Sequence, residues 1–142
     1  MLDVPYLPQA PELCGGAAAA MVMRYWGGGE VGAGSFAHLV RPVEGGIRTD
    51  ELTAEVRSRG WRARRVAPEA AAVRRHVRDG RPVILLLRVG PERFHFVVAV
   101  AAPGDAWLIH DPARAPFLRL SGEELAARWS PAERWGLLVL PA

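Results

Sequence analysis

The sequence predicts an α+β fold in which helices come first and an antiparallel sheet follows. Helix-forming segments with clear stop signals fill the first half of the chain, whereas strand-like apolar runs dominate the second half. Short turn segments separate most of these runs, and connections of hairpin length join antiparallel strands, not parallel ones. The chain has 142 residues, of which 50% are hydrophobic, so we expect a single domain over residues 1–142.

The first half is expected to pass from an extended segment into helices. In order, these elements are an extended segment at 4–13, a buried helix at 15–26, a short helix at 35–40 and a helix from 49 to 60. Prolines keep the first segment out of a helix. Four alanines followed by large apolar side chains predict the buried helix, which three glycines end. Thr49 is the expected N-cap of the last helix, and Gly60 its stop.

The second half is expected to be mostly strands. The predicted strands cover residues 61–66, 82–89, 94–101, 106–110, 117–120 and 135–140. A helix at 68–78 interrupts them, with Pro68 in its first turn and Gly80 after its end. Ser121 and Glu124 have the spacing of a capping box, which predicts a helix through Trp129.

Composition excludes several classes of protein. The single cysteine rules out an internal disulfide and a multi-cysteine metal site, and no histidine pair has zinc-site spacing, so we expect no metal and no cofactor. All 18 basic residues are arginine, but the net charge is only +3, which does not favour a nucleic-acid partner. No apolar run is long enough to cross a membrane and no signal peptide is visible, so a complete chain would be cytoplasmic.

Cys14 stands at the start of the predicted buried helix. A lone cysteine is more often a small buried apolar residue than a nucleophile. At a helix N-terminus, however, unpaired N–H groups and the helix dipole favour the reactive thiolate. Gly15 and Gly16 leave room for a substrate carbonyl to approach the sulfur, so we expect both glycines to be substrate-binding positions.

His95 is the expected base for such a nucleophile. It lies in the most apolar strand, where a buried imidazole needs a polar partner. Asp111 follows 16 residues later, at the end of the next strand, and an aspartate there can orient the ring. A structural histidine and a turn aspartate before proline are the alternative interpretations. His110 should point to the opposite face of its strand.

Gln9 lies in the proline-rich segment, five positions before Cys14. A glutamine amide held there, together with the Cys14 backbone N–H, could donate hydrogen bonds to the oxyanion of an acyl-transfer intermediate. A solvated loop glutamine is the simpler interpretation of Gln9 alone.

Taken in order, V-P-Y-L-P-Q-A-P-E-L-C-G-G, H-F-V-V-A-V and I-H-D-P resemble one family over residues 4–140. They resemble the bacteriocin-processing, double-glycine-leader peptidases, family thirty-nine of the cysteine peptidases, and their stand-alone relatives. The resemblance implies a papain-like fold, Cys14 as nucleophile, His95 as base, Asp111 as the orienting acid and Gln9 as the oxyanion donor. It also implies a peptide or protein substrate, such as a leader or precursor peptide, and hydrolysis of a peptide bond.

Two other functions remain open at this point. The same four residues would serve a papain-like acyltransferase or transpeptidase, in which an amine or thiol replaces water. A catalytically silent domain that binds a peptide is the alternative from a different class. The substrate sequence and the oligomeric state are not defined by the sequence.

Overall fold

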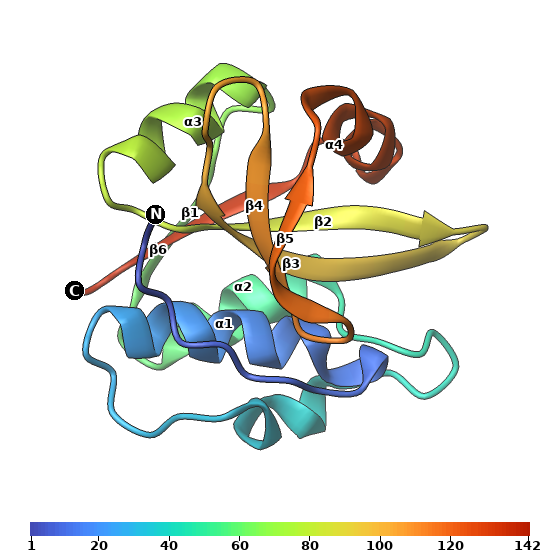
Figure 1. Cartoon of the computed structure of the whole chain (residues 1–142). Coiled ribbons are helices and arrows are strands. Elements are labelled where there is room, and N and C mark those ends of the chain that lie inside the picture. The colour runs from blue at the N-terminus through green and yellow to red at the C-terminus, as the bar shows by residue number, and fades with distance from the viewer.

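A six-stranded antiparallel sheet lies between two layers of helices (Figure 1). The structure is a computed structural model that describes residues 1–142. The helices are α1 (Cys14–Tyr25), α2 (Thr49–Ser58), α3 (Ala70–Arg78) and α4 (Gly122–Trp129), with short 3-10 helices η1 (Pro11–Leu13), η2 (Ala33–Leu39) and η3 (Ser130–Ala132). The strands are β1 (Arg62–Arg65), β2 (Val83–Gly90), β3 (Arg93–Ala101), β4 (Trp107–Asp111), β5 (Ala115–Leu120) and β6 (Gly136–Leu140). The predicted α+β class is confirmed.

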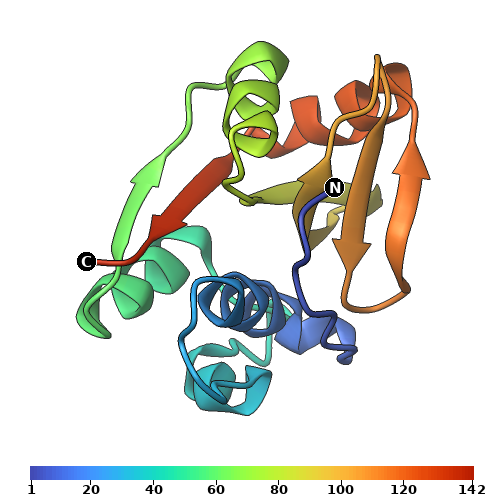
Figure 2. The same ribbon diagram turned by 60° about the vertical axis from the view of Figure 1, so that its left-hand side comes forward.

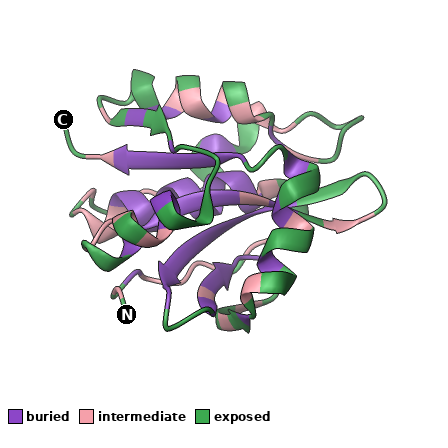
Figure 3. Cartoon of the chain, turned by 90° about the horizontal axis from the view of Figure 1, so that it is seen from above, coloured by how far each residue is buried: buried purple, intermediate pink, exposed green.

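The strand order is β1-β6-β2-β3-β4-β5, so the last strand of the chain lies inside the sheet. Leu138 of β6 pairs with Arg64 on one side and with Val83 on the other. Each face of the sheet has its own apolar core. Side chains of α1 and α2 pack on one face, and those of α3 and α4 pack on the other. Figure 3 shows the central strands as the most continuously buried part of the molecule.

Helix α1 is the most buried helix, as its sequence predicts. Every residue from Cys14 to Met23 is buried. The two glycines of its first turn allow this close packing. A Cβ on Gly15 would lie 3.0 Å from the Phe96 ring, and one on Gly16 would lie 2.8 Å from Cβ of Phe36. Packing therefore accounts for both glycines.

Two expected helix starts differ from the structure. Thr49 is the first residue of α2 and not its N-cap, because Arg48 is the last residue with an extended backbone and its carbonyl already accepts the Leu52 N–H at 2.9 Å. Pro68 lies before α3, whose N-cap is Glu69. The capping box of α4 is confirmed, since Ser121 and Glu124 exchange both bonds.

The N-terminal segment is fastened to the sheet before it reaches α1. Its backbone bonds join Leu2 to Val100 at 2.9 Å and Gln9 to Pro112 at 2.8 Å. The Tyr6 hydroxyl donates to the carbonyl of Asp111 at 2.7 Å. Figure 2 shows this segment descending from the sheet to the start of α1. It therefore ties the start of α1 to the end of β4.

None of the helices combines the length and the apolar character that crossing a membrane requires.

Candidate active site

Three of the predicted site residues come together at one end of the sheet. Cys14 is the first residue of α1, His95 lies near the start of β3 and Asp111 ends β4. Cys14 and His95 line the same cavity, which has a volume of about 550 Å³. β3 and β4 are neighbouring antiparallel strands, which brings Asp111 beside His95.

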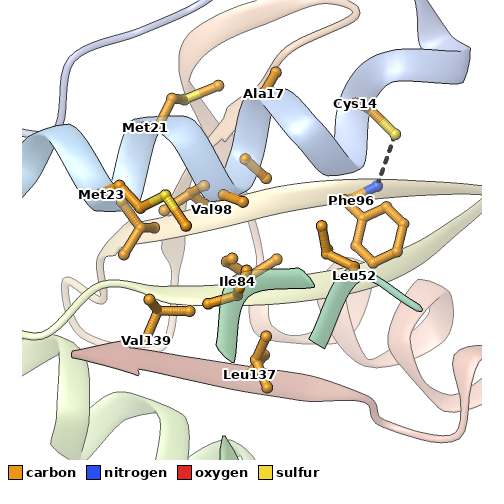
Figure 4. Close-up of a cluster of buried hydrophobic side chains, with 14 of the residues drawn as sticks. Cys14, Ala17, Met21, Met23, Leu52, Ile84, Phe96, Val98, Leu137 and Val139 are labelled. Atoms are coloured by element: carbon orange, nitrogen blue, oxygen red, sulfur yellow. Dashed lines mark hydrogen bonds between the residues drawn. The ribbon is translucent and has the colours of Figure 1, made fainter. Parts of the chain in front are cut away.

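The sulfur of Cys14 is held in a nearly dry environment. The residue is only 4% exposed, and its Sγ accepts a hydrogen bond from the Phe96 backbone N–H at 3.2 Å (Figure 4). Burial and, to a lesser extent, the charge of Asp111 raise the pKa of the thiol to about 11, although hydrogen bonds from the N–H groups of Phe96, Gly15 and Cys14 lower it. The expected preference of the helix N-terminus for the thiolate is thus outweighed by desolvation.

His95 and Asp111 form a close buried pair. His95 Nδ1 lies 3.8 Å from Asp111 Oδ1, and the two residues are 7% and 3% exposed. Nδ1 is buried and has no hydrogen-bond partner, so Asp111 is the group placed to accept a hydrogen bond from the Nδ1–H. Asp111 Oδ1 also accepts the Ala113 N–H at 3.0 Å, which fixes the carboxylate. His95 Nε2 makes no hydrogen bond to the protein and is left for the thiol or a substrate.

The three other histidines are engaged elsewhere. His110 is fully buried, with Nε2 at 2.8 Å from the Val4 carbonyl and Nδ1 accepting the Phe117 N–H. Burial lowers the pKa of His110, and these two bonds hold a neutral ring. His76 accepts a bond from Arg81, and His38 pairs with Glu55 on the surface. His95 is therefore the imidazole available to Cys14.

The expected oxyanion donors are not directed into the cavity that Cys14 and His95 line. Gln9 is half-buried, does not line the cavity, and its side chain makes no hydrogen bond within the protein. Its backbone N–H is bonded to Pro112, which places the residue beside the turn that follows Asp111. The Cys14 N–H bonds to the Pro11 carbonyl in η1. Neither Gly15 nor Gly16 lines the cavity.

The outer wall of the cavity is a segment that the sequence analysis did not single out. Residues 44–50 line it opposite the β2–β3 hairpin. An Arg41–Gly46 bridge closes a small turn here, and ion pairs join Arg41 to Glu51 and Arg48 to Glu44. No local sequence signal identifies the Glu44–Arg48 ion pair, because the i,i+4 rule applies to helices and these residues precede α2.

No group of three or more histidine, cysteine, aspartate or glutamate side chains is arranged to hold a metal ion. The site brings together a thiol, an imidazole and a carboxylate, the three groups that thiol-dependent acyl transfer uses.

Comparison with known proteins finds one matching family and several similar structures. Residues 1–134 match the Peptidase C39 like family. A Bacillus anthracis protein described as a C39-like peptidase superposes with a TM-score of 0.80 at 16% identity, covering 99% of this chain and 96% of the other. The peptidase domain of Streptococcus ComA, a bi-functional ABC transporter involved in quorum sensing, gives 0.78 at 17% identity, with 96% and 97% covered.

A double glycine motif protease from an AMS/PCAT transporter, solved in complex with the leader peptide, gives a TM-score of 0.74 at 23% identity. That comparison covers 99% of this chain and 93% of the other. No curated protein matches the sequence. The likenesses confirm the predicted fold.

Proposed function

Because the chain belongs to the Peptidase C39 like family, we propose that it is a cysteine peptidase that hydrolyses a peptide bond with Cys14, His95 and Asp111. One observation carries the proposal. Cys14 and His95 line one cavity, and the otherwise unpartnered Nδ1 of His95 lies 3.8 Å from the Asp111 carboxylate. A buried imidazole between a sulfur and a carboxylate has the arrangement of a thiol-peptidase triad.

The thiol is neutral at pH 7, because the pKa of Cys14 is raised to about 11. His95 therefore takes the Sγ proton as the sulfur attacks the substrate carbonyl carbon. A C–S bond forms, and the carbonyl oxygen becomes an oxyanion. The Gln9 amide is our proposed donor to this oxyanion, which requires its free side chain to turn toward the cavity.

Collapse of the intermediate breaks the C–N bond, and His95 gives its proton to the leaving amine. Water then attacks the thioester while His95 accepts its proton. The acid product leaves, and the proton returns to Cys14. Asp111 keeps Nδ1 protonated and stabilises the imidazolium in both halves of the reaction.

The substrate class we propose is a peptide, such as a leader or precursor peptide. A cavity of about 550 Å³ falls within the range of small-ligand sites and accommodates a few residues of an extended chain. The similar AMS/PCAT protease was solved with a leader peptide, which supports the same class here.

A mixed peptide library, analysed by mass spectrometry, tests the proposal. We expect cleavage by the wild type and a loss of about a thousandfold or more in Cys14→Ala and in His95→Gln. His38→Gln is the matched control, since His38 is exposed and pairs only with Glu55. Undiminished cleavage by Cys14→Ala would rule out the proposal.

Peptide binding without turnover is the second candidate, and one observation favours it. Cys14 receives no hydrogen bond from His95, and burial raises its thiol pKa. If the protein only binds peptides, we expect the wild type to cleave no library peptide and to bind these peptides as tightly as the Cys14→Ala variant does. Cleavage that depends on Cys14 excludes it.

A further inference from the structure

A second cavity adjoins the first on the far side of His95. It has a volume of about 720 Å³ and shares Pro11, Arg93 and His95 with the first cavity, but Cys14 does not line it. Its walls are the β2–β3 hairpin, the turn after Asp111, and α4 with η3. Figure 1 shows the β2–β3 hairpin projecting beyond the helices.

Four guanidinium groups gather in this second cavity. The arginines are Arg88, Arg93, Arg114 and Arg128, and no aspartate or glutamate is among the lining residues. None of the four forms an ion pair with an acid of the protein. Arg88 donates only to the Gly90 carbonyl. The charge of Arg128 lowers the pKa of Glu124, and the Glu124 carboxylate is already hydrogen-bonded in the α4 capping box.

The first cavity is different in charge. It contains Glu44, Asp50 and Glu92 beside its arginines, so both signs of charge are present. The second cavity is lined by positive charge alone, and such a concentration of one sign favours an anionic ligand. Arginine suits carboxylates in particular, because its planar fork donates two parallel hydrogen bonds.

His95 links the second cavity to one part of the substrate. Side chains alternate along β3, with Phe96 and Val98 on the α1 face and Val97 on the opposite face. His95 alternates with Phe96 and so lies on the face that α4 covers. In a thiol peptidase the acyl carbon is at the cysteine and the leaving nitrogen is at the histidine. The residues after the scissile bond therefore continue past His95, away from Cys14.

We propose that the second cavity binds acidic side chains that follow the scissile bond of the substrate, making this a peptidase selective for an acidic leaving segment. The inference rests on the proposed function. The carboxylates of that segment bind the guanidinium groups of Arg88, Arg114 and Arg128, and Arg93 lies at the junction of the two cavities.

Arg114 lies in the same turn as Asp111, and this turn fixes its position relative to His95. Its backbone N–H donates to the Asp111 carbonyl at 3.0 Å, and the Asp111 carboxylate accepts the N–H of Ala113. The residue that faces His95 thus also builds the turn that carries Arg114. A carboxylate held by Arg114 is positioned relative to His95 by a single rigid turn.

Matched peptides test the inference, starting from the best library substrate. Two versions carry either glutamate or glutamine at the second and third residues after the cleaved bond. We expect kcat/KM to be about tenfold higher for the glutamate peptide, since several partly exposed charge pairs act together. The preference should fall when NaCl is raised from about 0.1 M to about 1 M.

The Arg114→Gln/Arg128→Gln double variant should lose this preference, with kcat/KM for the glutamate peptide falling to that for the glutamine peptide. Arg75→Gln is the control, because Arg75 is exposed on α3 and makes no side-chain bond. It should keep the full preference. Equal cleavage of both peptides by the wild type overturns the inference and leaves the peptidase proposal intact.

A binding measurement separates the two proposals further. Fluorescence anisotropy of the labelled glutamate peptide is measured with Cys14→Ala, with and without the two arginine changes. Tighter binding of the glutamate peptide that requires Arg114 and Arg128 supports the inference. Equal binding of both peptides overturns it, and so does full displacement by a single-stranded oligonucleotide of the same charge.

Discussion

The sulfur of Cys14 experiences two opposing effects. Burial and the nearby Asp111 charge disfavour the thiolate, while the Phe96 N–H favours it. The first effect is larger, so the pKa rises to about 11. This differs from a preformed thiolate–imidazolium pair, in which the sulfur is already charged at neutral pH. In the proposed mechanism, proton transfer to His95 therefore accompanies the attack on the substrate.

The pH dependence of Cys14 alkylation by iodoacetamide follows from this balance. Only the thiolate reacts, and a raised pKa means that less of it is present at pH 7 than for an ordinary thiol. We expect slow labelling at pH 7 that increases steeply above pH 9, toward a midpoint near the raised pKa of about 11. The unfolded chain in urea should label with a midpoint near about 8.5.

Circular dichroism, recorded at each pH, identifies the pH range in which the protein stays folded, and only labelling rates from that range are used. Fast labelling below pH 8 that collapses in His95→Ala would contradict the expectation and indicate a preformed ion pair.

Helix α1 determines where Cys14 lies. Its first turn is pressed between β3 and η2, and this is possible because Gly15 and Gly16 lack side chains. A Cβ on Gly16 would meet Cβ of Phe36 at 2.8 Å and the Ala33 carbonyl oxygen at 3.0 Å. One of these neighbours is backbone, so the contact cannot be relieved by turning a side chain.

Gly16→Ala tests this packing. Alanine is the better helix former by about 1 kcal/mol, but the clash opposes that gain. We expect a net loss of about 1–3 kcal/mol in the free energy of unfolding, measured by urea denaturation. Gly34→Ala is the matched control, since a Cβ there meets nothing within 4 Å. It should change stability by less than about 1 kcal/mol. A Gly16→Ala protein as stable as wild type would show that η2 can move away.

At the scale of the whole molecule, two tyrosine hydroxyls join segments that are far apart in the sequence. Tyr6 donates to the Asp111 carbonyl at 2.7 Å, which ties the N-terminal segment to the end of β4. Tyr25, at the end of α1, donates to the Gly80 carbonyl at 2.7 Å, in the turn between α3 and β2. The two bonds are equal in length, but only the first is at the candidate site.

Tyr6→Phe and Tyr25→Phe therefore form a matched pair. Each removes one partly buried hydroxyl donor, which in Tyr6 also approaches the Pro112 carbonyl at 3.3 Å, and each should lower the free energy of unfolding by about 1 kcal/mol. Only Tyr6→Phe should reduce kcat/KM, by roughly tenfold, because it loosens the backbone that carries Asp111. Urea denaturation and cleavage of a library substrate measure the two effects. An equal loss of activity in both variants would show that Tyr6 acts through stability alone.

The sequence alone was enough to predict features that depend on residues close to one another in the chain. The buried helix after Cys14, the α4 capping box and the order of strands along the chain all follow from propensity, turn residues and short-range periodicity. The spacing of His95 and Asp111 was informative for the same reason, because strands joined by a short hairpin pair with each other. The start of α2 was misassigned at Thr49, since capping depends on one residue's conformation.

Other features were decided only when distant segments met. β6 inserts between β1 and β2, and no local pattern reports which strands it will pair with. The thiol pKa is set mainly by burial, and the close approach of Phe96 and Phe36 leaves no room for side chains at Gly15 and Gly16. The arginines of the second cavity come from β2, β3, the turn after β4, and α4. Desolvation, close packing and clustered charge depend on which surfaces come together in space, and only the tertiary structure defines those surfaces.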